Sequence, residues 1–309
     1  MANKYINTKK WFKISVAIYA ILFIAGIVFT VIGGVKLDIN FSGGTRITYS
    51  YTGEVDEAAA KDVIKGVIDK DFTTGKNTSI AGDTKTLSIS LAGKDSLAAE
   101  KQEALTDALV KEIKDNNIEL YDSNSVSPSV AGSFLVKALV AVLITAILVI
   151  IYVGFRFRRI GGVSAALTAL CALVIDIFAS FFACAIFGLQ IDANYMAVVL
   201  TILGYSLNDT IVIYDRVREN KRMYPDLPVS ENMDMSITGI ITRNIVTTLT
   251  TTIAVLTIIV VAEIYGLVSL RTFAIPMVFG LISGCFSSLF VAGPPWVRWR
   301  EFRDSKKAK

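Results

Sequence analysis

Long apolar blocks separated by polar segments dominate the pattern of residues along the chain. Six blocks carry almost no charge, and they lie at 13–34, 134–154, 163–188, 191–214, 244–263 and 271–292. Each is about 20 residues long, the length that a helix needs to cross roughly 30 Å of hydrocarbon. A water-soluble chain instead spaces its apolar residues around a core at the period of a helix or strand. The pattern therefore predicts a polytopic α-helical membrane protein with six transmembrane helices.

The segment between the first two blocks has the composition of a water-soluble domain. Strands are expected at 45–51, 78–80, 87–91 and 119–126, and amphipathic helices at 56–70 and 96–116. Alternating β-branched residues indicate the strands, and apolar residues at helical spacing indicate the helices. The order β-α-β-β-α-β is typical of a ferredoxin-like α+β domain, which we expect between the first and second transmembrane helices.

Lysine and arginine gather beside the ends of the apolar blocks. The groups are Lys4 to Lys13, Arg156 to Arg159, Arg216 to Arg222 and Arg298 to Lys309. Such clusters contact nucleic acid or anionic lipid in some proteins, but beside spans they more often mark the cytoplasmic side. This interpretation places both termini in the cytoplasm and the α+β domain on the extracytoplasmic side. The first block is longer than the core of a signal peptide, so we expect it to remain as a span.

These patterns divide the chain into four parts. They are a cytoplasmic tail with the first transmembrane helix at 1–34, the extracytoplasmic α+β domain at 35–132, a five-helix transmembrane region at 133–293 and a basic cytoplasmic tail at 294–309. A polar segment at 215–243, which contains Pro225 and Pro228, interrupts the five-helix region. We expect it to form a cytoplasmic loop with a helix lying in the membrane interface.

Composition narrows the chemistry that the chain can perform. Hydrophobic residues make up 53% of it, its mean hydropathy is +0.56 and its net charge is +4. It contains no histidine, which excludes histidine-based catalysis and proton relays through imidazole. The three cysteines all fall in apolar blocks, without the spacing of a metal site or disulfide framework. Since no hydrolase motif or nucleotide loop occurs either, the sequence predicts no enzyme and no cofactor or metal site.

A few ionisable residues lie where the membrane would be. Asp176 is near the middle of the third block, Asp209 is in the cytoplasmic half of the fourth, and Arg243 opens the fifth. An ionisable group at the centre of a bilayer costs about 2.5–3.5 kcal/mol on insertion scales. Each of these side chains therefore needs a partner or a water-filled path. For Asp176 a structural role, as a protonated or hydrogen-bonded carboxyl, is favoured over a functional one.

Helical spacing gathers polar residues into two stripes. Thr201, Tyr205, Asn208, Asp209 and Val212 share a face of the fourth span, and Arg243, Thr247, Thr250 and Thr251 share a face of the fifth. In a structural interpretation, Asp209 and Arg243 form a buried ion pair that fixes helix register. In a functional one, the protonation of Asp209 alternates and Arg243 tunes its proton affinity. Spacing alone does not decide between them.

Three motifs resemble the SecF branch of the SecDF family of protein-export proteins. They are LDINFSGGT after the first block, LTILGYSLNDTIVIYDRVREN across the end of the fourth, and ITRNIVTTLTT at the start of the fifth. By the match of motifs, Asp209 and Arg243 correspond to ion-pathway residues, with Asn208 beside them, and Asp176 corresponds to an aspartate of the third span. Many members have histidine before that aspartate, but Ile175 stands there in this chain.

The resemblance implies a subunit of the bacterial plasma membrane that helps exported proteins across it. Such a subunit pairs with SecD, associates with the SecYEG channel and acts on exported unfolded polypeptides, using a gradient of H⁺ or Na⁺. It contacts membrane lipid but no nucleic acid. Two alternatives stay open. One is a non-energised assembly subunit, and the other is half of a small-molecule exporter of the resistance-nodulation-division superfamily.

Overall fold

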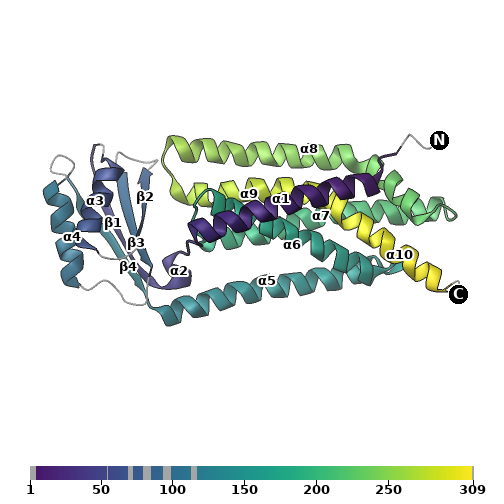
Figure 1. Cartoon of the computed structure of the whole chain (residues 1–309), viewed down its shortest axis with the longest axis horizontal. Coiled ribbons are helices and arrows are strands. Elements are labelled where there is room, and N and C mark those ends of the chain that lie inside the picture. Colours follow the sequence, from purple (N-terminus) through teal and green to yellow (C-terminus); the bar gives the residue numbers. More distant parts are fainter. Residues whose placement is uncertain are drawn as a thin grey trace.

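The fold has two parts, an α+β domain at one end and a long helical bundle (Figure 1). The computed structural model describes residues 5–53, 55–68, 72–78, 85–92, 99–112 and 117–307. Within these residues, six helices are long and apolar enough to cross a membrane. They are α1 (Thr8–Gly33), α5 (Pro128–Arg156), α6 (Gly162–Ile186), α7 (Ala193–Met223), α8 (Val229–Ile264) and α9 (Val268–Ser287) with its continuation. The prediction of six transmembrane helices is confirmed.

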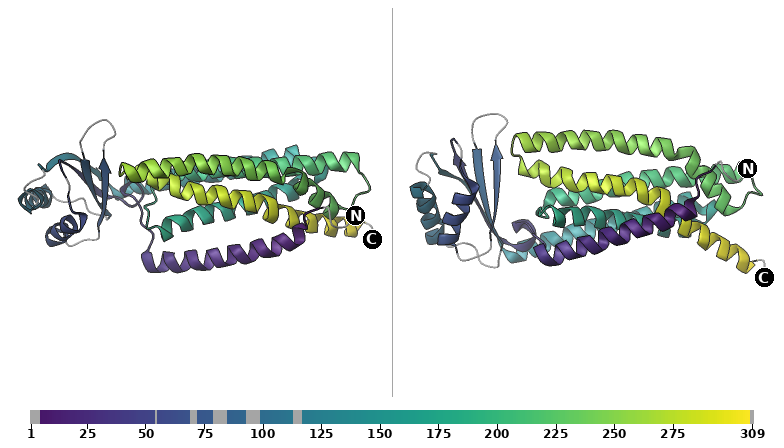
Figure 2. Two further views of the ribbon diagram at one scale, coloured as in Figure 1. Left: turned by 90° about the horizontal axis from the view of Figure 1, so that it is seen from above. Right: turned by 45° about the horizontal axis from the view of Figure 1, so that its top comes forward.

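Helix α9 lies at the centre of the bundle. In its most apolar window 83% of the residues are buried, against 11% in α1 and 6% in α5. Helix α1 lies along the outside, and a π-helical turn, η2 (Ser288–Ala292), joins α9 to α10 (Gly293–Lys307) (Figure 2). The exposed apolar side chains of the outer helices, such as Ile21 and Leu148, form a surface suited to lipid. The start of α1 and the end of α10 lie away from the α+β domain (Figure 1).

The α+β domain contains one antiparallel sheet with two helices on one face. Its strands are β1 (Gly44–Tyr51), β2 (Phe72–Thr78), β3 (Lys85–Ala92) and β4 (Glu119–Val126), in the sheet order β2-β3-β1-β4. Helices α3 (Glu57–Val67) and α4 (Ala99–Glu112) cover the sheet face that carries Ile47, Tyr49, Leu87 and Ile89. The element order agrees with the order that the sequence predicts.

One strand lies earlier than the sequence pattern indicates. The expected strand at 78–80 is replaced by β2, which ends at Thr78, and residues 79–80 lie outside the described residues. Gly75, Lys76 and Asn77 interrupt the alternation of apolar residues that normally reveals a strand. Pairing with β3 from Phe72 to Thr78 forms the strand despite this weak local preference.

The segment 215–243 is helical except at one short connection, and the expected position of a helix in the membrane interface stays a prediction. Helix α7 continues to Met223 and α8 begins at Val229, which leaves 224–228 as the connection. Pro228 stands at the N-cap of α8, where the missing amide hydrogen of proline does no harm.

Buried amides and hydroxyls hold this helical hairpin together. Asn220 of α7 donates a hydrogen bond to Ser236 of α8 at 2.8 Å, and Asn232 donates to the carbonyl oxygen of Val217 at 3.1 Å. The side chains of Asn220, Asn232 and Ser236 are all buried. In the sequence these polar residues suggest a loop, but in the structure they form hydrogen bonds between two packed helices.

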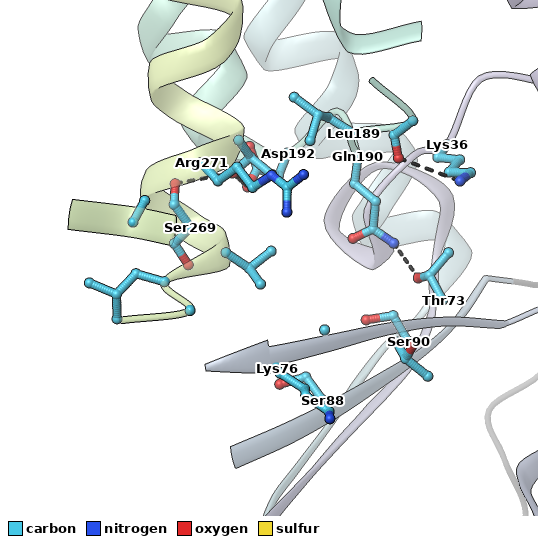
Figure 3. Close-up of a pocket in the computed structure, with 18 of the residues that line it drawn as sticks. Lys36, Thr73, Lys76, Ser88, Ser90, Leu189, Gln190, Asp192, Ser269 and Arg271 are labelled. Carbon is cyan, nitrogen blue, oxygen red and sulfur yellow. Dashed lines mark hydrogen bonds between the residues drawn. The ribbon is translucent and has the colours of Figure 1, made fainter. Parts of the chain in front are cut away.

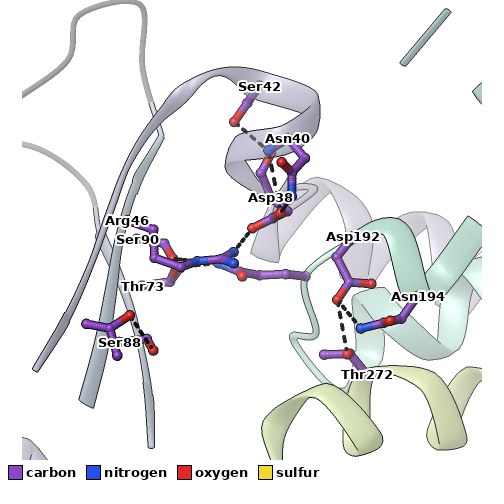
Figure 4. Close-up of polar contacts among 12 residues, drawn as sticks. Asp38, Asn40, Ser42, Arg46, Thr73, Ser88, Ser90, Asp192, Asn194 and Thr272 are labelled. Atoms are coloured by element: carbon purple, nitrogen blue, oxygen red, sulfur yellow. Dashed lines mark hydrogen bonds and ion pairs between the residues drawn. The ribbon is translucent and has the colours of Figure 1, made fainter. Parts of the chain in front are cut away.

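The α+β domain is attached to the bundle through Asp38, at the N-cap of the short helix α2 (Ile39–Ser42). Figure 4 shows Arg46 of β1 reaching across to this carboxylate, with which it forms an ion pair. Asp38 also accepts a hydrogen bond from the Asn40 side chain at 2.6 Å, and Arg46 donates a second bond to Ser90 at 3.1 Å. Because Asp38 is only 1% exposed, this pair fixes the start of β1 relative to α2.

The same segment is bonded to the loop between α6 and α7. The Asp38 amide donates to the Ile191 carbonyl at 3.0 Å, and the Ile191 amide donates to the Lys36 carbonyl at 2.8 Å. From this loop, Gln190 bonds to Thr73 of β2. Asp192 caps α7 and accepts a hydrogen bond from Thr272 of α9 at 3.3 Å (Figure 4). The domain is thus bonded to the loop before α7, and the Asp192 cap of α7 is bonded in turn to the start of α9.

Candidate functional site

Asp176 of α6 lies at the centre of a cage of serine hydroxyls. Its side chain is fully buried, and Oδ1 accepts a hydrogen bond from Ser283 at 2.6 Å. Oδ2 accepts bonds from Ser206 at 2.6 Å and from Ser287 at 2.8 Å. The donors come from α7 and α9, which both pack against α6. Three hydroxyl groups thus bond to this buried carboxyl, and no basic side chain among the described residues pairs with it.

The serine cage continues into a longer polar network. Tyr19 of α1 donates to the carbonyl of Ser283 at 3.0 Å. On the other side, Ser288 donates to the carbonyl of Ser206 at 3.1 Å, and Thr210 donates to Ser288 Oγ at 3.0 Å. Hydrogen bonds therefore connect α1, α6, α7 and α9 through the interior of the bundle, around one carboxyl group.

Asp209 of α7 is also buried, but it is held in a different way. It is 4% exposed, and no hydrogen bond to it is formed by any residue that the structure describes. It lines a narrow gap between α7 and α9 with Ser206, Gly280 and Gly284, and this gap has no room for a water molecule. Ser206 therefore bonds to Asp176 and also lines the gap beside Asp209. Asp209 is the carboxyl group in this region that lacks donors.

The ion pair between Asp209 and Arg243, which the structural interpretation of the two stripes requires, is not formed. Both residues are described, and no nitrogen–oxygen distance within 4.0 Å joins them, although the Arg243 charge acts on Asp209. Asp209 faces α9, whereas Arg243 is exposed on α8 and lines a groove with Asp215 and Arg222. Sequence spacing places a residue on a helix face but does not say which helix packs against that face. In this structure Asp209 faces α9.

The remaining residues of the two polar stripes lie on the outside of the bundle. Thr201 and Asn208 are exposed on α7, and Thr247 is half-buried on α8. The Tyr205 hydroxyl bonds to Thr251, which joins the stripes across α7 and α8. Thr247 bonds back to the carbonyl of Arg243 at 2.8 Å. A polar face on a membrane-spanning bundle cannot point to lipid without a large penalty, so it requires a protein or water-lined neighbour.

The sequence reasoning identified both buried aspartates but missed the serines around Asp176. Ser283 and Ser287 stand four residues apart on α9, a spacing that puts both hydroxyls on one helix face. That spacing is the signal available in the sequence. It is weak, because serine in an apolar helix usually bonds to its own backbone. Among the described residues, no group of three or more histidine, cysteine, aspartate or glutamate side chains is placed to hold a metal ion.

Comparisons with known proteins match this chain over most of its length. Residues 106–302 match the family model of the protein export membrane protein SecD/SecF, C-terminal. The protein translocase subunit SecF of Alicyclobacillus acidocaldarius is 30% identical over 98% of this chain and 94% of its own length. The protein translocase subunit SecDF of Bacillus subtilis is 32% identical over 92% of this chain and 36% of its own length.

A solved structure has the same fold. The crystal structure of SecDF, a translocon-associated membrane protein from Thermus thermophilus, superposes with a TM-score of 0.77 at 24% identity. The superposition covers 97% of this chain but 39% of that one. The chain therefore spans about two fifths of the solved SecDF protein.

Proposed function

Because the chain belongs to the SecD/SecF family of protein-export membrane proteins, we propose that it is a SecF-type subunit that uses an ion gradient, together with SecD, to assist the translocation or release of exported polypeptides. Its role is transport rather than catalysis, in keeping with relatives that are named translocase subunits. The observation that carries the proposal is Asp209, a buried carboxyl without hydrogen-bond donors among the described residues, beside an exposed polar face.

The two buried aspartates suit different roles. Asp176 has donors on both oxygens, so a change in its charge would disturb four helices at once. Asp209 has only the nearby charge of Arg243, which makes protonation and deprotonation possible without breaking a hydrogen bond. We therefore assign the loading and release of the ion, H⁺ or Na⁺, to Asp209. Arg243 and Asn208 are assigned to the pathway that leads to it, and Asp176 supports the helices around it.

The exposed polar face supports a partner within the membrane. Thr201, Asn208 and Arg243 form a surface that suits a second half-bundle better than lipid. The name of the Bacillus subtilis relative joins SecD and SecF, and this chain matches 36% of its length, which leaves room for such a half in the same chain. We assign SecD to this face, with Tyr205 and Thr247 as supporting polar groups. The SecYEG channel and the exported unfolded polypeptide are further proposed partners.

The proposed orientation puts the basic ends of the helices in the cytoplasm of a bacterial cell. The start of α1 and the end of α10 then lie inside, and residues 35–132 lie outside. The sheet order β2-β3-β1-β4 and the element order support a ferredoxin-like extracytoplasmic domain. Its bonds to the loop before α7, whose Asp192 is bonded to α9, provide a route by which movement beside Asp209 reaches the domain.

The energy available from the gradient suits small movements. One charge that crosses 100 mV releases about 2.3 kcal/mol, and one pH unit adds about 1.4 kcal/mol. These amounts bias a domain between two orientations, but they do not drive a long translocation step at once. We therefore propose repeated small movements that prevent the exported chain from sliding back.

One observation favours the second candidate function, a non-energised assembly subunit. The gap beside Asp209 is closed to water, as a purely structural packing of α7 and α9 would be. The small-molecule exporter is not supported in this way. The cleft of about 560 Å³ beside the α+β domain is lined mainly by charged and hydroxyl side chains, whereas drug-sized ligands are held mainly by apolar ones.

Export of a secreted reporter tests the proposal in cells depleted of their own SecF. The cells would carry this chain or its Asp209→Asn or Arg243→Lys variant, with co-purification of SecD as the measure of assembly. We expect the wild-type chain to restore export and Asp209→Asn to lose it with normal assembly. Full export by both variants would assign these charges to structure and support the assembly subunit instead.

A further inference from the structure

An open cleft separates the α+β domain from the ends of the membrane helices. It has a volume of about 560 Å³, and its walls come from β1, β2 and β3 on one side and from the ends of α6, α8 and α9 on the other. Figure 3 shows Ser88, Ser90 and Lys76 on the sheet side, opposite Leu189, Ser269 and Arg271. None of the groups assigned to the ion pathway lines it.

The sheet contributes a polar face to this cleft. Arg46 of β1 is paired in register with Ser90 of β3, which is paired with Thr73 of β2. Thr48 and Ser88 are paired in the next row, and their hydroxyl oxygens approach each other at 3.3 Å. Apolar residues of the same strands point to the opposite face, beneath α3 and α4. The cleft therefore presents hydroxyl groups, which suit a hydrated or phosphate-bearing ligand rather than an apolar one.

Basic residues outnumber acidic ones in the cleft. Its basic lining residues are Lys36, Arg46, Lys61, Lys76 and Arg271, and its acidic lining residues are Asp192 and Glu263. Asp192 is already bonded to Asn194 and Thr272, and Glu263 pairs with Arg271 at 3.1 Å. Arg46 is paired with Asp38, so the excess positive charge comes from the lysines. Lys36 is exposed and donates only a 3.4 Å bond to the carbonyl of Gly188. The excess charge favours an anion.

The position of the cleft relative to the helices indicates the source of that anion. Helix α6 ends at Ile186, α8 ends at Ile264 and α9 begins at Val268, and the residues just beyond these ends line the cleft. Lipid headgroups occupy the layer immediately beyond the hydrocarbon that helices span. In the proposed orientation, Lys36 and Arg271 also stand beside spans on the side where basic residues are normally scarce.

We propose that this cleft binds the phosphate-bearing headgroup of an anionic phospholipid from the extracytoplasmic leaflet. Lys36 supplies positive charge, as does Lys76, whose ammonium also donates to the carbonyl oxygen of Val55. Ser88 and Ser269 lie within the same cleft and can donate hydrogen bonds. Arginine and lysine with hydroxyl donors are the groups that recognise phosphate. A lipid held here fills the space between the sheet and the helix ends. This proposal rests on the proposed orientation in the membrane but not on the role of Asp209.

Native mass spectrometry of the purified full-length chain tests the site, with phosphatidylglycerol and phosphatidylcholine titrated separately. We expect phosphatidylglycerol to bind more tightly to the wild-type chain. The double variant Lys36→Gln/Lys76→Gln is expected to weaken its tightest binding roughly 20-fold, since each basic residue near an anionic surface accounts for roughly a fivefold effect. Ser269→Asp introduces a negative charge without removing a cation, and we expect it to weaken binding too.

The matched control is Lys9→Gln/Lys10→Gln, which removes the same charge from exposed residues at the start of α1. This control is expected to retain wild-type affinity. Equal affinity of the wild-type and both cleft variants would overturn the proposal, as would an equal loss in the control. Displacement of the lipid by inorganic phosphate at similar concentration would assign the site to free phosphate and overturn the assignment to lipid. Displacement by an acidic peptide alone would assign it to polypeptide and also overturn the proposal.

Discussion

Ser283 of α9 donates a hydrogen bond to Oδ1 of Asp176 at 2.6 Å, and it is the sole donor to that oxygen among the residues that the structure describes. Oδ2, in contrast, has two donors, Ser206 and Ser287. Removal of one serine hydroxyl can therefore leave Oδ1 without a hydrogen-bond donor, whereas Oδ2 keeps one donor. This asymmetry gives the serine cage a quantitative test.

Ser283→Ala is expected to destabilise the protein more than Ser287→Ala. Removal of Ser283 leaves a buried oxygen without a donor, which costs about 1–3 kcal/mol. After Ser287→Ala, Oδ2 still has Ser206. The thermal unfolding midpoint of the purified chain in detergent measures the difference. Ser133→Ala is the control, because Ser133 is exposed and bonds to the carbonyl of Val130. Equal midpoints for Ser283→Ala and the control would contradict the cage.

Gly280→Ala is expected to force α7 and α9 apart. A Cβ atom at Gly280 would overlap the side chain of Ile202. Such overpacking lowers the free energy of unfolding by about 1–3 kcal/mol. Gly204→Ala is the matched variant, since nothing lies within 4 Å of its added Cβ. There the gain in helix propensity is about 0.5–1 kcal/mol. Detergent unfolding midpoints should move in opposite directions. Partial rescue of Gly280→Ala by Ile202→Ala would locate the clash.

Asp38→Asn is expected to loosen the connection between the α+β domain and the bundle. The variant removes the charge that Arg46 and Asn40 bind, and a hydrogen bond to a charged group contributes about 1.5–3 kcal/mol. Hydrogen exchange at the backbone amides of position 38 and of Ile191 should then become roughly tenfold faster or more. Arg156→Gln is the control, because its pair with Asp215 is exposed and contributes about 0–1 kcal/mol. Unchanged exchange at Ile191 would show that backbone bonds alone hold the junction.

Alkaline conditions are expected to weaken the core of the α+β domain through Tyr49. Burial raises the pKa of the Tyr49 phenol above its ordinary value of 10, while the hydrogen bond with Thr106 acts in the opposite direction. Because the folded pKa is raised, the stabilising contribution is complete below pH 10 and is lost as pH rises through the folded pKa. Hydrogen exchange of the β1 and β3 amides should accelerate above about pH 10, after correction for intrinsic rates. Tyr49→Phe should remove this part of the pH dependence, and an identical profile would contradict it.

Much of the architecture follows from the sequence because the membrane imposes few choices. Hydrocarbon thickness sets the length of the apolar blocks, so α1 and α5 to α9 were all predicted. Asp176 and Asp209 stood out because they are acidic residues inside long apolar blocks. The long helices at 215–243 were harder to predict because polar residues such as Asn220 indicate solvent in the sequence, whereas here they bond between packed helices.

The partners of the two aspartates required the structure. Helical spacing put Asp209 on the same stripe as Asn208, but packing turns Asp209 toward α9 and leaves Asn208 exposed. A rotation of a few tens of degrees about a helix axis separates these outcomes, and sequence spacing does not resolve it. Likewise, Ser283 meets Asp176 across 107 positions of sequence. Only the packing of α6 against α9 brings them together.

Ion uptake by proteoliposomes that contain the chain and SecD tests the role of Asp209 most directly. The vesicles would enclose a proton- or sodium-sensitive dye, and an imposed membrane potential would start the uptake. Asp226→Asn serves as the control, because it removes an exposed carboxylate from the loop after α7. We predict uptake by the wild-type and Asp226→Asn proteins and its loss in Asp209→Asn at equal incorporation. Equal uptake by the wild-type and Asp209→Asn proteins would contradict the assignment of the ion pathway to Asp209.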